Sequence, residues 1–254
     1  MLEIASGQSA NALWYAGTRP LHMLSVLPSG EAADTQDLLQ ACAVLQQLGY
    51  PVVVLDGTEA ESDDAPGLRE LMQPRSGFSH TALPVGNQAH IVATLPAAFG
   101  LVQLVQRAKL QSTRPLELLY RHLRNHALVV ILAPETVLAP LLQGCQQSPM
   151  LMVPTTQHNV VDSYRALKHI FMHTGLMPRL LALRSQDSGL DPVLRTIAQC
   201  ALHQLHTEPL AEQLDPQHPR QLRRWALQCL EQAEAVHAPQ SGDRAASSPL
   251  AWSH

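Results

Sequence analysis

Short, continuous apolar runs constrain the fold of this chain more than any other feature of the sequence. The run at residues 127–133 reads ALVVILA, so neither face of a strand built from it carries a polar side chain. Such a strand is buried on both sides, as in a parallel sheet that helices cover on both faces. Further runs that are short and rich in aliphatic residues lie at 21–27, 51–55, 90–95, 150–154 and 176–183.

Stretches with helical spacing separate these runs. The sequence therefore predicts an α/β fold with a mostly parallel, doubly wound sheet flanked by helices, and it predicts strand 21–27 among the central members. The expected helices lie at 34–48, 101–109, 115–125, 136–143 and 160–174, with two C-terminal helices at 191–206 and 219–237. We expect one domain over residues 1–237 and a disordered tail over residues 238–254, which is rich in Pro, Ser, Ala and Gly.

Composition narrows the class of protein. The chain has 254 residues, of which 46% are hydrophobic and 15% charged, with a formal net charge of -4. It contains no apolar stretch of about 18 residues and no targeting segment at its start, so we expect a cytoplasmic protein. Four cysteines lie far apart without a C-x-x-C motif, which argues against a zinc site or a disulfide framework. Scattered basic residues argue against binding to nucleic acid.

The loop after the first apolar run lies where a phosphate-binding loop would lie in such a fold. Residues 27–38 read LPSGEAADTQDL. A phosphate loop needs several glycines, a lysine, and a Ser or Thr for magnesium. This loop meets only the last requirement, through Thr35. Glu31 and Asp34 would repel a phosphate. The sequence therefore predicts a loop that does not clamp a nucleotide.

The order of motifs around this loop resembles the MinD/ParA family of P-loop ATPases over residues 20 to 185. The resemblance rests on QQLGY, PVVVLDG, GLREL, HIVATLPAAFGL, NHALVVILAPE and MLMVPTTQHNVVDSYRALKHIF. The last passage, residues 150–171, is most similar to the branch that controls flagellar number. It keeps Pro154, Asp162, Tyr164 and Lys168 at the matching positions.

The resemblance implies a P-loop-NTPase-like fold with a degenerate nucleotide loop. That loop would comprise Ser29, Gly30, Glu31, Asp34 and Thr35, which lack both family lysines. The family's magnesium-binding aspartate falls at or beside Ala133. Hydrolysis of ATP needs both the lysine-bearing loop and the magnesium-binding aspartate. We therefore expect a pseudo-ATPase with no catalytic residues, no cofactor, and no ATP-dependent homodimer.

What remains is a regulatory protein that binds a protein partner, in placement or number control of a surface organelle such as the flagellum. The candidate partner-binding residues are Asp56, Asp162, Tyr164 and Lys168. Each also has a structural interpretation, as a turn residue for Asp56 and as helix stabilisation for the other three. The alternative is an ATP-binding partitioning ATPase with a non-standard phosphate loop, in cell division, plasmid partition or cellulose secretion. It would have to recruit a lysine, and Lys109 and Lys168 are the only lysines of the chain.

Two further patterns have a functional and a structural interpretation. His122 and His126, and likewise His169 and His173, are four residues apart on expected helices, a spacing that can bind a metal. No Glu stands in an H-E-x-x-H pattern, and we expect no metal. Residues 220–236 form an amphipathic helix that could attach to a membrane or pack on the domain. The short apolar stripe favours packing.

Overall fold

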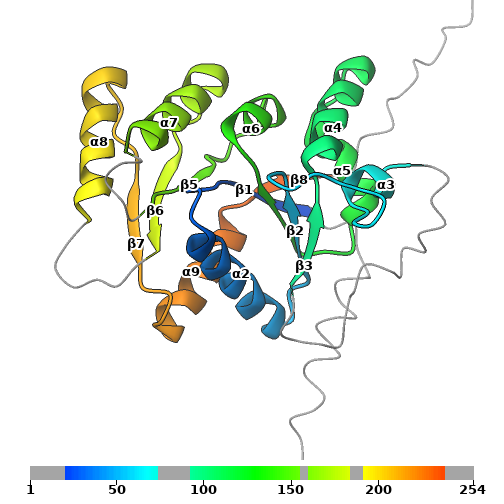
Figure 1. Cartoon of the computed structure of the whole chain (residues 1–254), viewed down its shortest axis with the longest axis horizontal. Coiled ribbons are helices and arrows are strands. Elements are labelled where there is room, and N and C mark those ends of the chain that lie inside the picture. The colour runs from blue at the N-terminus through cyan, green and yellow to red at the C-terminus, as the bar shows by residue number, and fades with distance from the viewer. Residues whose placement is uncertain (1–20, 74–91, 155–159, 184–190, 238–254) are drawn as a thin grey trace, which may run out of the picture.

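An eight-stranded sheet forms the centre of the molecule (Figure 1). The computed structural model describes residues 21–73, 92–154, 160–183 and 191–237. The strands follow the order β3-β2-β4-β1-β5-β6-β7, and β8 pairs with β1. Their bounds are β1 Leu21–Leu27, β2 Val52–Asp56, β3 Ala93–Pro96, β4 Leu128–Leu132, β5 Met150–Met152, β6 Arg179–Leu183, β7 Ala211–Leu214 and β8 Glu234–Val236. All pairs are parallel except β1 with β8, which are antiparallel.

Helices cover both faces of this sheet, as Figure 1 shows. On one face, α2 packs against α9; on the other, α4, α6, α7 and α8 follow one another, with α3 and α5 beside α4. The helix bounds are α2 Ala32–Gln47, α3 Leu68–Leu71, α4 Ala98–Gln111, α5 Pro115–Leu123, α6 Glu135–Leu141, α7 Val160–Thr174, α8 Pro192–Leu205 and α9 Pro219–Glu231. The predicted α/β fold with a doubly wound, mostly parallel sheet is confirmed. No helix in the described ranges is long and apolar enough to cross a membrane.

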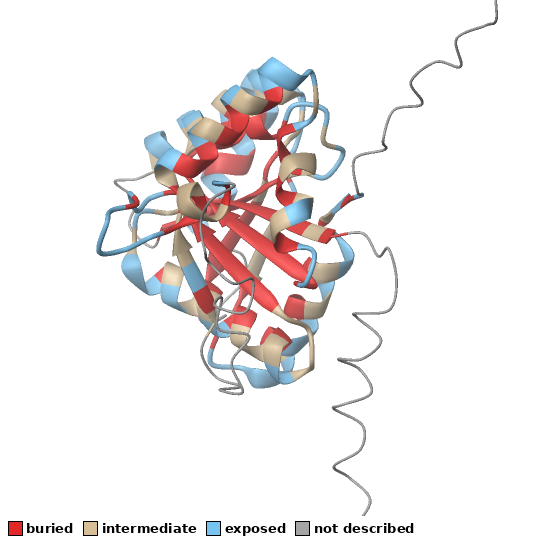
Figure 2. Ribbon diagram, turned by 90° about the vertical axis from the view of Figure 1, so that its right-hand side faces the viewer, coloured by how far each residue is buried: buried red, intermediate tan, exposed pale blue. Residues whose placement is uncertain are grey.

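The apolar side chains of the strands divide between the two faces. Along β4, Val129 and Ile131 point to the core under α4 and α6, whereas Leu128, Val130 and Leu132 point to the core under α2 and α9. All five are buried. Figure 2 shows that the strands of the sheet are largely buried. Two-sided burial explains why this segment reads as a continuous apolar run rather than as an alternating one.

Helix α2 shows how the sequence forms the layer on one face. Leu38, Ala41, Cys42 and Leu45 recur at helical spacing and are buried. The helix ends where Gly49 takes a φ of 89° and its N–H donates to the carbonyl of Gln46 at 2.9 Å. Glycine reaches this left-handed conformation without a steric cost, so it stops the helix and turns the chain into β2.

Helix α9 packs on the domain through its apolar side. Leu222, Trp225, Ala226 and Cys229 are buried in the core shared with α2. The predicted helix 219–237 is wrong at its end, because α9 stops at Glu231 and strand β8 follows. Three residues are too few to show a period of two. This strand pairs with residues Leu21 to Met23 of β1, whereas β5 pairs with Val26 and Leu27 at the other end of the same strand.

All six predicted strands form, with ends that shift by up to three residues. Strand β7 went unpredicted because its sequence AEQL is half polar, as an outer strand of a sheet can be. Residues 90 and 91 of the predicted strand 90–95 and the predicted tail 238–254 lie outside the described residues.

Candidate functional site

The carboxyl edge of the sheet, where β1, β2, β4 and β5 end, is where ligands bind in sheets of this type. Strand β1 leads through α2 toward β2, and β5 leads through α7 toward β6 on the other side. The direction in which successive strands are placed along the sheet therefore reverses between β1 and β5. The crevice outside such a switch point is the usual binding place in open α/β sheets. The candidate loop, residues 28–31, begins there.

The candidate loop contains two hydrogen bonds of its own backbone amides. Gly30 has a φ of 86° and is the loop's only residue in the left-handed region. The Glu31 N–H donates to the Ser29 hydroxyl at 3.0 Å. The Thr35 N–H points to the Glu31 carbonyl at 3.5 Å. A phosphate cradle needs several amides that converge on one point and stay available. With one glycine and an amide already donating to Ser29, this loop is poorly suited to that task.

Asp34 lies inside the protein at the start of α2. Only 3% of its surface is exposed, and it lies in line with Leu38, Ala41 and Leu45 on the buried side of the helix. A carboxylate in the first turn interacts favourably with the helix dipole. A phosphate approaching the same helix start would meet the oxygens of this carboxyl group, and neither lysine of the chain belongs to this loop.

No carboxylate occupies the place of a magnesium ligand at the end of β4. Ala133 is fully buried, and its N–H donates to the Val26 carbonyl at 3.1 Å. Gly57 packs against it so closely that an added Cβ would lie 2.6 Å from the Ala133 Cβ. The ends of β2 and β4 therefore form a tight apolar contact here.

Asp56 has a local structural role at the end of β2. Its Oδ1 accepts hydrogen bonds from the Thr58 N–H at 2.9 Å and the Thr58 hydroxyl at 2.6 Å, and the residue is 8% exposed. An aspartate that holds the backbone two residues later is a common turn device. This geometry fits the turn interpretation of Asp56.

Glu61 is the most elaborately bonded acidic side chain of the edge, and the sequence analysis missed it. It is 5% exposed. Its carboxylate accepts from the N–H groups of Phe99 at 2.8 Å and Gly100 at 2.7 Å, both at the start of α4, and from Arg69 at 3.3 Å, at the start of α3. Helix starts are natural anion sites. Here the chain supplies the anion itself.

Glycines make room for this buried carboxylate. A Cβ added to Gly100 would lie 2.7 Å from Glu61 Oε1, and one added to Gly67 would lie 2.7 Å from Glu61 Cγ. The glycines were the only sequence signal of this arrangement. They follow Glu61 by six and 39 residues, so no local pattern connects them with it.

The candidate residues of α7 do not converge with Asp56. Asp162 forms an ion pair with Arg165 at 2.9 Å, and both side chains are about 70% exposed. Tyr164 is half-buried against the core, and Lys168 is exposed. Between β2 and β5 lie β4 and β1, so the strand ends are about 14 Å apart at the usual strand spacing. These positions form separate features rather than one site.

One of the two histidine pairs differs from the sequence expectation. Helix α5 ends at Leu123, so His126 lies beyond the helix and the pair with His122 is not on one helical face. His126 is buried, its Nδ1 lies 3.2 Å from the Leu123 carbonyl, and burial lowers its pKa. His169 and His173 do share α7, with ring centroids 4.1 Å apart. The described residues contain no group of three or more metal-binding side chains.

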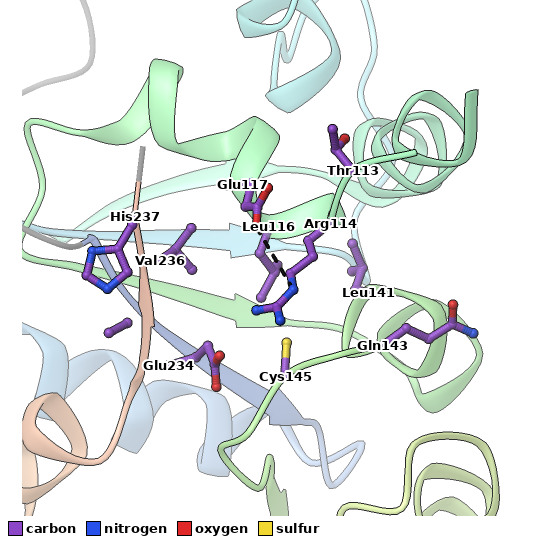
Figure 3. Close-up of a pocket in the computed structure, with 11 residues that line it drawn as sticks. Thr113, Arg114, Leu116, Glu117, Leu141, Gln143, Cys145, Glu234, Val236 and His237 are labelled. Carbon is purple, nitrogen blue, oxygen red and sulfur yellow. Dashed lines mark ion pairs between the residues drawn. The ribbon is translucent and has the colours of Figure 1, made fainter. Parts of the chain in front are cut away.

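A pocket of about 460 Å³ lies at the opposite end of the sheet, beside β8 (Figure 3). Arg114 approaches Glu117 to 4.0 Å across it, and the Glu234 carboxylate accepts from the N–H groups of Gln146 and Gln147 at 2.9 Å each. Burial, and secondly the charge of Glu234, raise the pKa of the Cys145 thiol to about 12. A thiol with such a pKa is protonated at neutral pH and is a poor nucleophile. Strand β1 spans about 20 Å, which separates the pocket from the candidate loop.

Comparisons with known proteins find a similarity among solved structures only. No protein-family model and no curated protein matches the chain. Among solved structures, the chain is similar to pnob8 ParA with a TM-score of 0.48 and 12% identity, over 83% of this chain and 99% of that one. A similarity of this size assigns neither a family nor an activity to the chain.

Proposed function

We propose that this protein is a catalytically silent, MinD/ParA-like regulator that acts by binding a protein partner. One observation supports the proposal most strongly. At the carboxyl edge, where such folds bind phosphates, the chain places its own buried carboxylates, Asp34 at the start of α2 and Glu61 at the start of α4. Both helix starts therefore already carry the negative charge that a nucleotide would bring.

Electrostatic repulsion and backbone geometry both act against nucleotide binding at this edge. Two unit charges of the same sign, 4 Å apart near a protein surface, repel by about 4 kcal/mol. The loop after β1 offers no lysine, and Ala133 offers no magnesium ligand. A nucleotide would thus find no lysine, no magnesium ligand and no set of converging amides at this loop.

Calorimetric titration of the full chain with magnesium and ATP tests this proposal. We expect no binding heat for the natural protein or for Asp34→Lys, because reversing one charge restores neither the amides nor the metal ligand. Micromolar affinity, which corresponds to about 8 kcal/mol, would contradict the proposal and favour the ATP-binding partitioning ATPase. A phosphate-binding ATPase titrated in parallel confirms that the measurement detects binding.

The cellular process is a second part of the proposal. Control of organelle number, such as that of flagella, is supported by the resemblance of residues 150–171 to the branch that controls flagellar number. Deletion of the gene should change the number or position of flagella, and the Asp34→Lys variant should restore them as well as the natural protein does. Normal flagella after deletion would overturn this assignment without bearing on nucleotide binding.

The partner surface is best sought among the exposed candidates. Lys168 and Asp162 are exposed, whereas Asp56 is buried in its turn. Charge reversal at Lys168 should therefore weaken partner binding without loss of folding, whereas changes at Asp56 would disturb the turn. Arg223→Glu on α9 is the matched control, because it reverses an exposed basic side chain on the other face of the sheet.

A further inference from the structure

Helix α4 carries an apolar line on its outward side, in addition to its buried side. Phe99, Val102 and Leu110 are 54%, 45% and 87% exposed. With Gln106, they advance by three, four and four residues, so they lie in one line along the helix. We call Phe99, Val102, Gln106 and Leu110 the α4 stripe. It extends over about 16 Å of the helix.

This stripe is unusual for a solvated helix face. Leu101, Leu104, Val105 and Ala108 already bury the inner side of α4 against the core. The outer side of such a helix is normally polar, and single exposed apolar residues need no explanation. Three in line on one helix, of the seven large apolar residues exposed in the described chain, form a surface suited to a partner.

Charges of opposite sign stand at the two ends of the stripe. At the amino end, Glu59, Asp63 and Asp64 are exposed, and the Glu59 carbonyl accepts from the N–H of Ala98 at 3.0 Å, which places this segment against the start of α4. At the other end stands Lys109, also exposed. None of these four groups has an ion pair in the described part of the chain.

We propose that a second copy of this chain docks on the α4 stripe, with the two α4 helices antiparallel about a twofold axis. Phe99 of one copy then packs beside Leu110 of the other, and Val102 lies near the axis. The acidic end of each copy meets Lys109 of its mate, so each contact occurs twice, as in an isologous dimer. A parallel pair would bring like charges together at both ends, and it would be disfavoured.

The pairing uses no nucleotide, and it does not depend on the proposed function. Its free-energy gain comes from the apolar line, with the charges setting direction and register. Helix α4 lies in the outer helix layer on the β3 side of the sheet (Figure 1), away from α2 and α9. One helix line is a small contact compared with the roughly 800 Å² that each partner buries in a standard interface. We therefore expect a reversible dimer.

Sedimentation of the full chain over a concentration series, without nucleotide, tests the dimer. We expect the dimer mass at high concentration, and at least a tenfold weaker association for Val102→Glu. Leu202→Glu is the matched control, because Leu202 on α8 is also 45% exposed, and it should associate like the natural protein. A natural protein that stays monomeric, or an unchanged Val102→Glu dimer, would overturn the proposal.

A charge exchange tests the direction of the pairing. Lys109→Glu alone should weaken association, and so should the triple change Glu59→Lys, Asp63→Lys and Asp64→Lys. Combined in one chain, the two sets should restore association, because each end again meets its opposite. Circular dichroism confirms that each variant is folded. Failure of the combined variant to regain association would reject the antiparallel arrangement.

Discussion

The two ends of the sheet contrast in how the chain uses charge. At the carboxyl edge, Glu61 is enclosed and fully engaged with backbone amides of two helices. At the amino end, Glu234, Glu117 and Arg114 border an open pocket of about 460 Å³. At the usual binding end of an α/β sheet, the described chain thus places its own buried carboxylate, whereas this pocket lies at the other end. A position in the fold alone therefore does not identify a working site.

The thiol of Cys145 gives the largest expected effect. Because its pKa is raised to about 12, the thiolate fraction at pH 8 is about one in ten thousand, against roughly one quarter for a free cysteine. Alkylation of Cys145 at pH 8 should be about a thousandfold slower than in the urea-unfolded chain, as followed by mass spectrometry of the modified peptide. Glu234→Gln should speed it, because the Glu234 charge raises this pKa. Equal rates in folded and unfolded chains would contradict the effect of burial on this thiol.

Removal of the Glu61 carboxylate gives the next largest effect. Glu61→Ala leaves three backbone N–H groups at the starts of α3 and α4 without their acceptor, at about 1 kcal/mol or more each. We expect the free energy of unfolding to fall by about 3 to 4 kcal/mol in urea denaturation. Glu59→Ala removes an exposed acid from the same segment and should change it by less than about 0.5 kcal/mol. Similar losses for both variants would refute the capping role.

Substitution of two glycines at the carboxyl edge should lower the free energy of unfolding by different amounts, for steric reasons. Gly100→Ala places a Cβ 2.7 Å from both Glu61 Oε1 and Leu68 Cβ, so we expect a loss of about 2 kcal/mol in the free energy of unfolding. Gly30→Ala meets no atom within 4 Å, but it forces a positive φ on alanine, at about 1 kcal/mol. Urea denaturation compares the two. An equal or reversed order would show that the contact around Glu61 can relax.

His126 gives the smallest expected effect, at the amino end of β4. Burial lowers its pKa in the folded state, so the folded protein holds it neutral while the unfolded chain takes up a proton at higher pH. Its contribution is present above the ordinary histidine pKa and is lost as the pH falls through that value. The free energy of unfolding should therefore decline from pH 7.5 to 5.5, and less steeply in His126→Gln. An identical slope in the variant would assign the decline to other groups.

The sequence predicted the layers of the fold because they depend on local patterns. A run such as residues 127–133, which is apolar on both sides of a strand, indicates a sheet that helices cover on both faces. Strands β7 and β8 escaped prediction, since four and three residues with polar members show no period. The absence of lysine from the candidate loop could be recognised in the sequence. The Glu61 arrangement could not, because its acceptor and its donors at Phe99 and Gly100 are almost 40 residues apart.

Strand β8 has a consequence for folding during synthesis. It pairs with the first half of β1, so almost the whole described chain separates the two partners. Until residues 234–236 leave the ribosome, the amino half of this central strand keeps an open side on which another chain could pair. Pairings over such sequence distances form late and slowly. A nascent or C-terminally shortened chain should therefore aggregate more readily than the finished one, and depend more on chaperones.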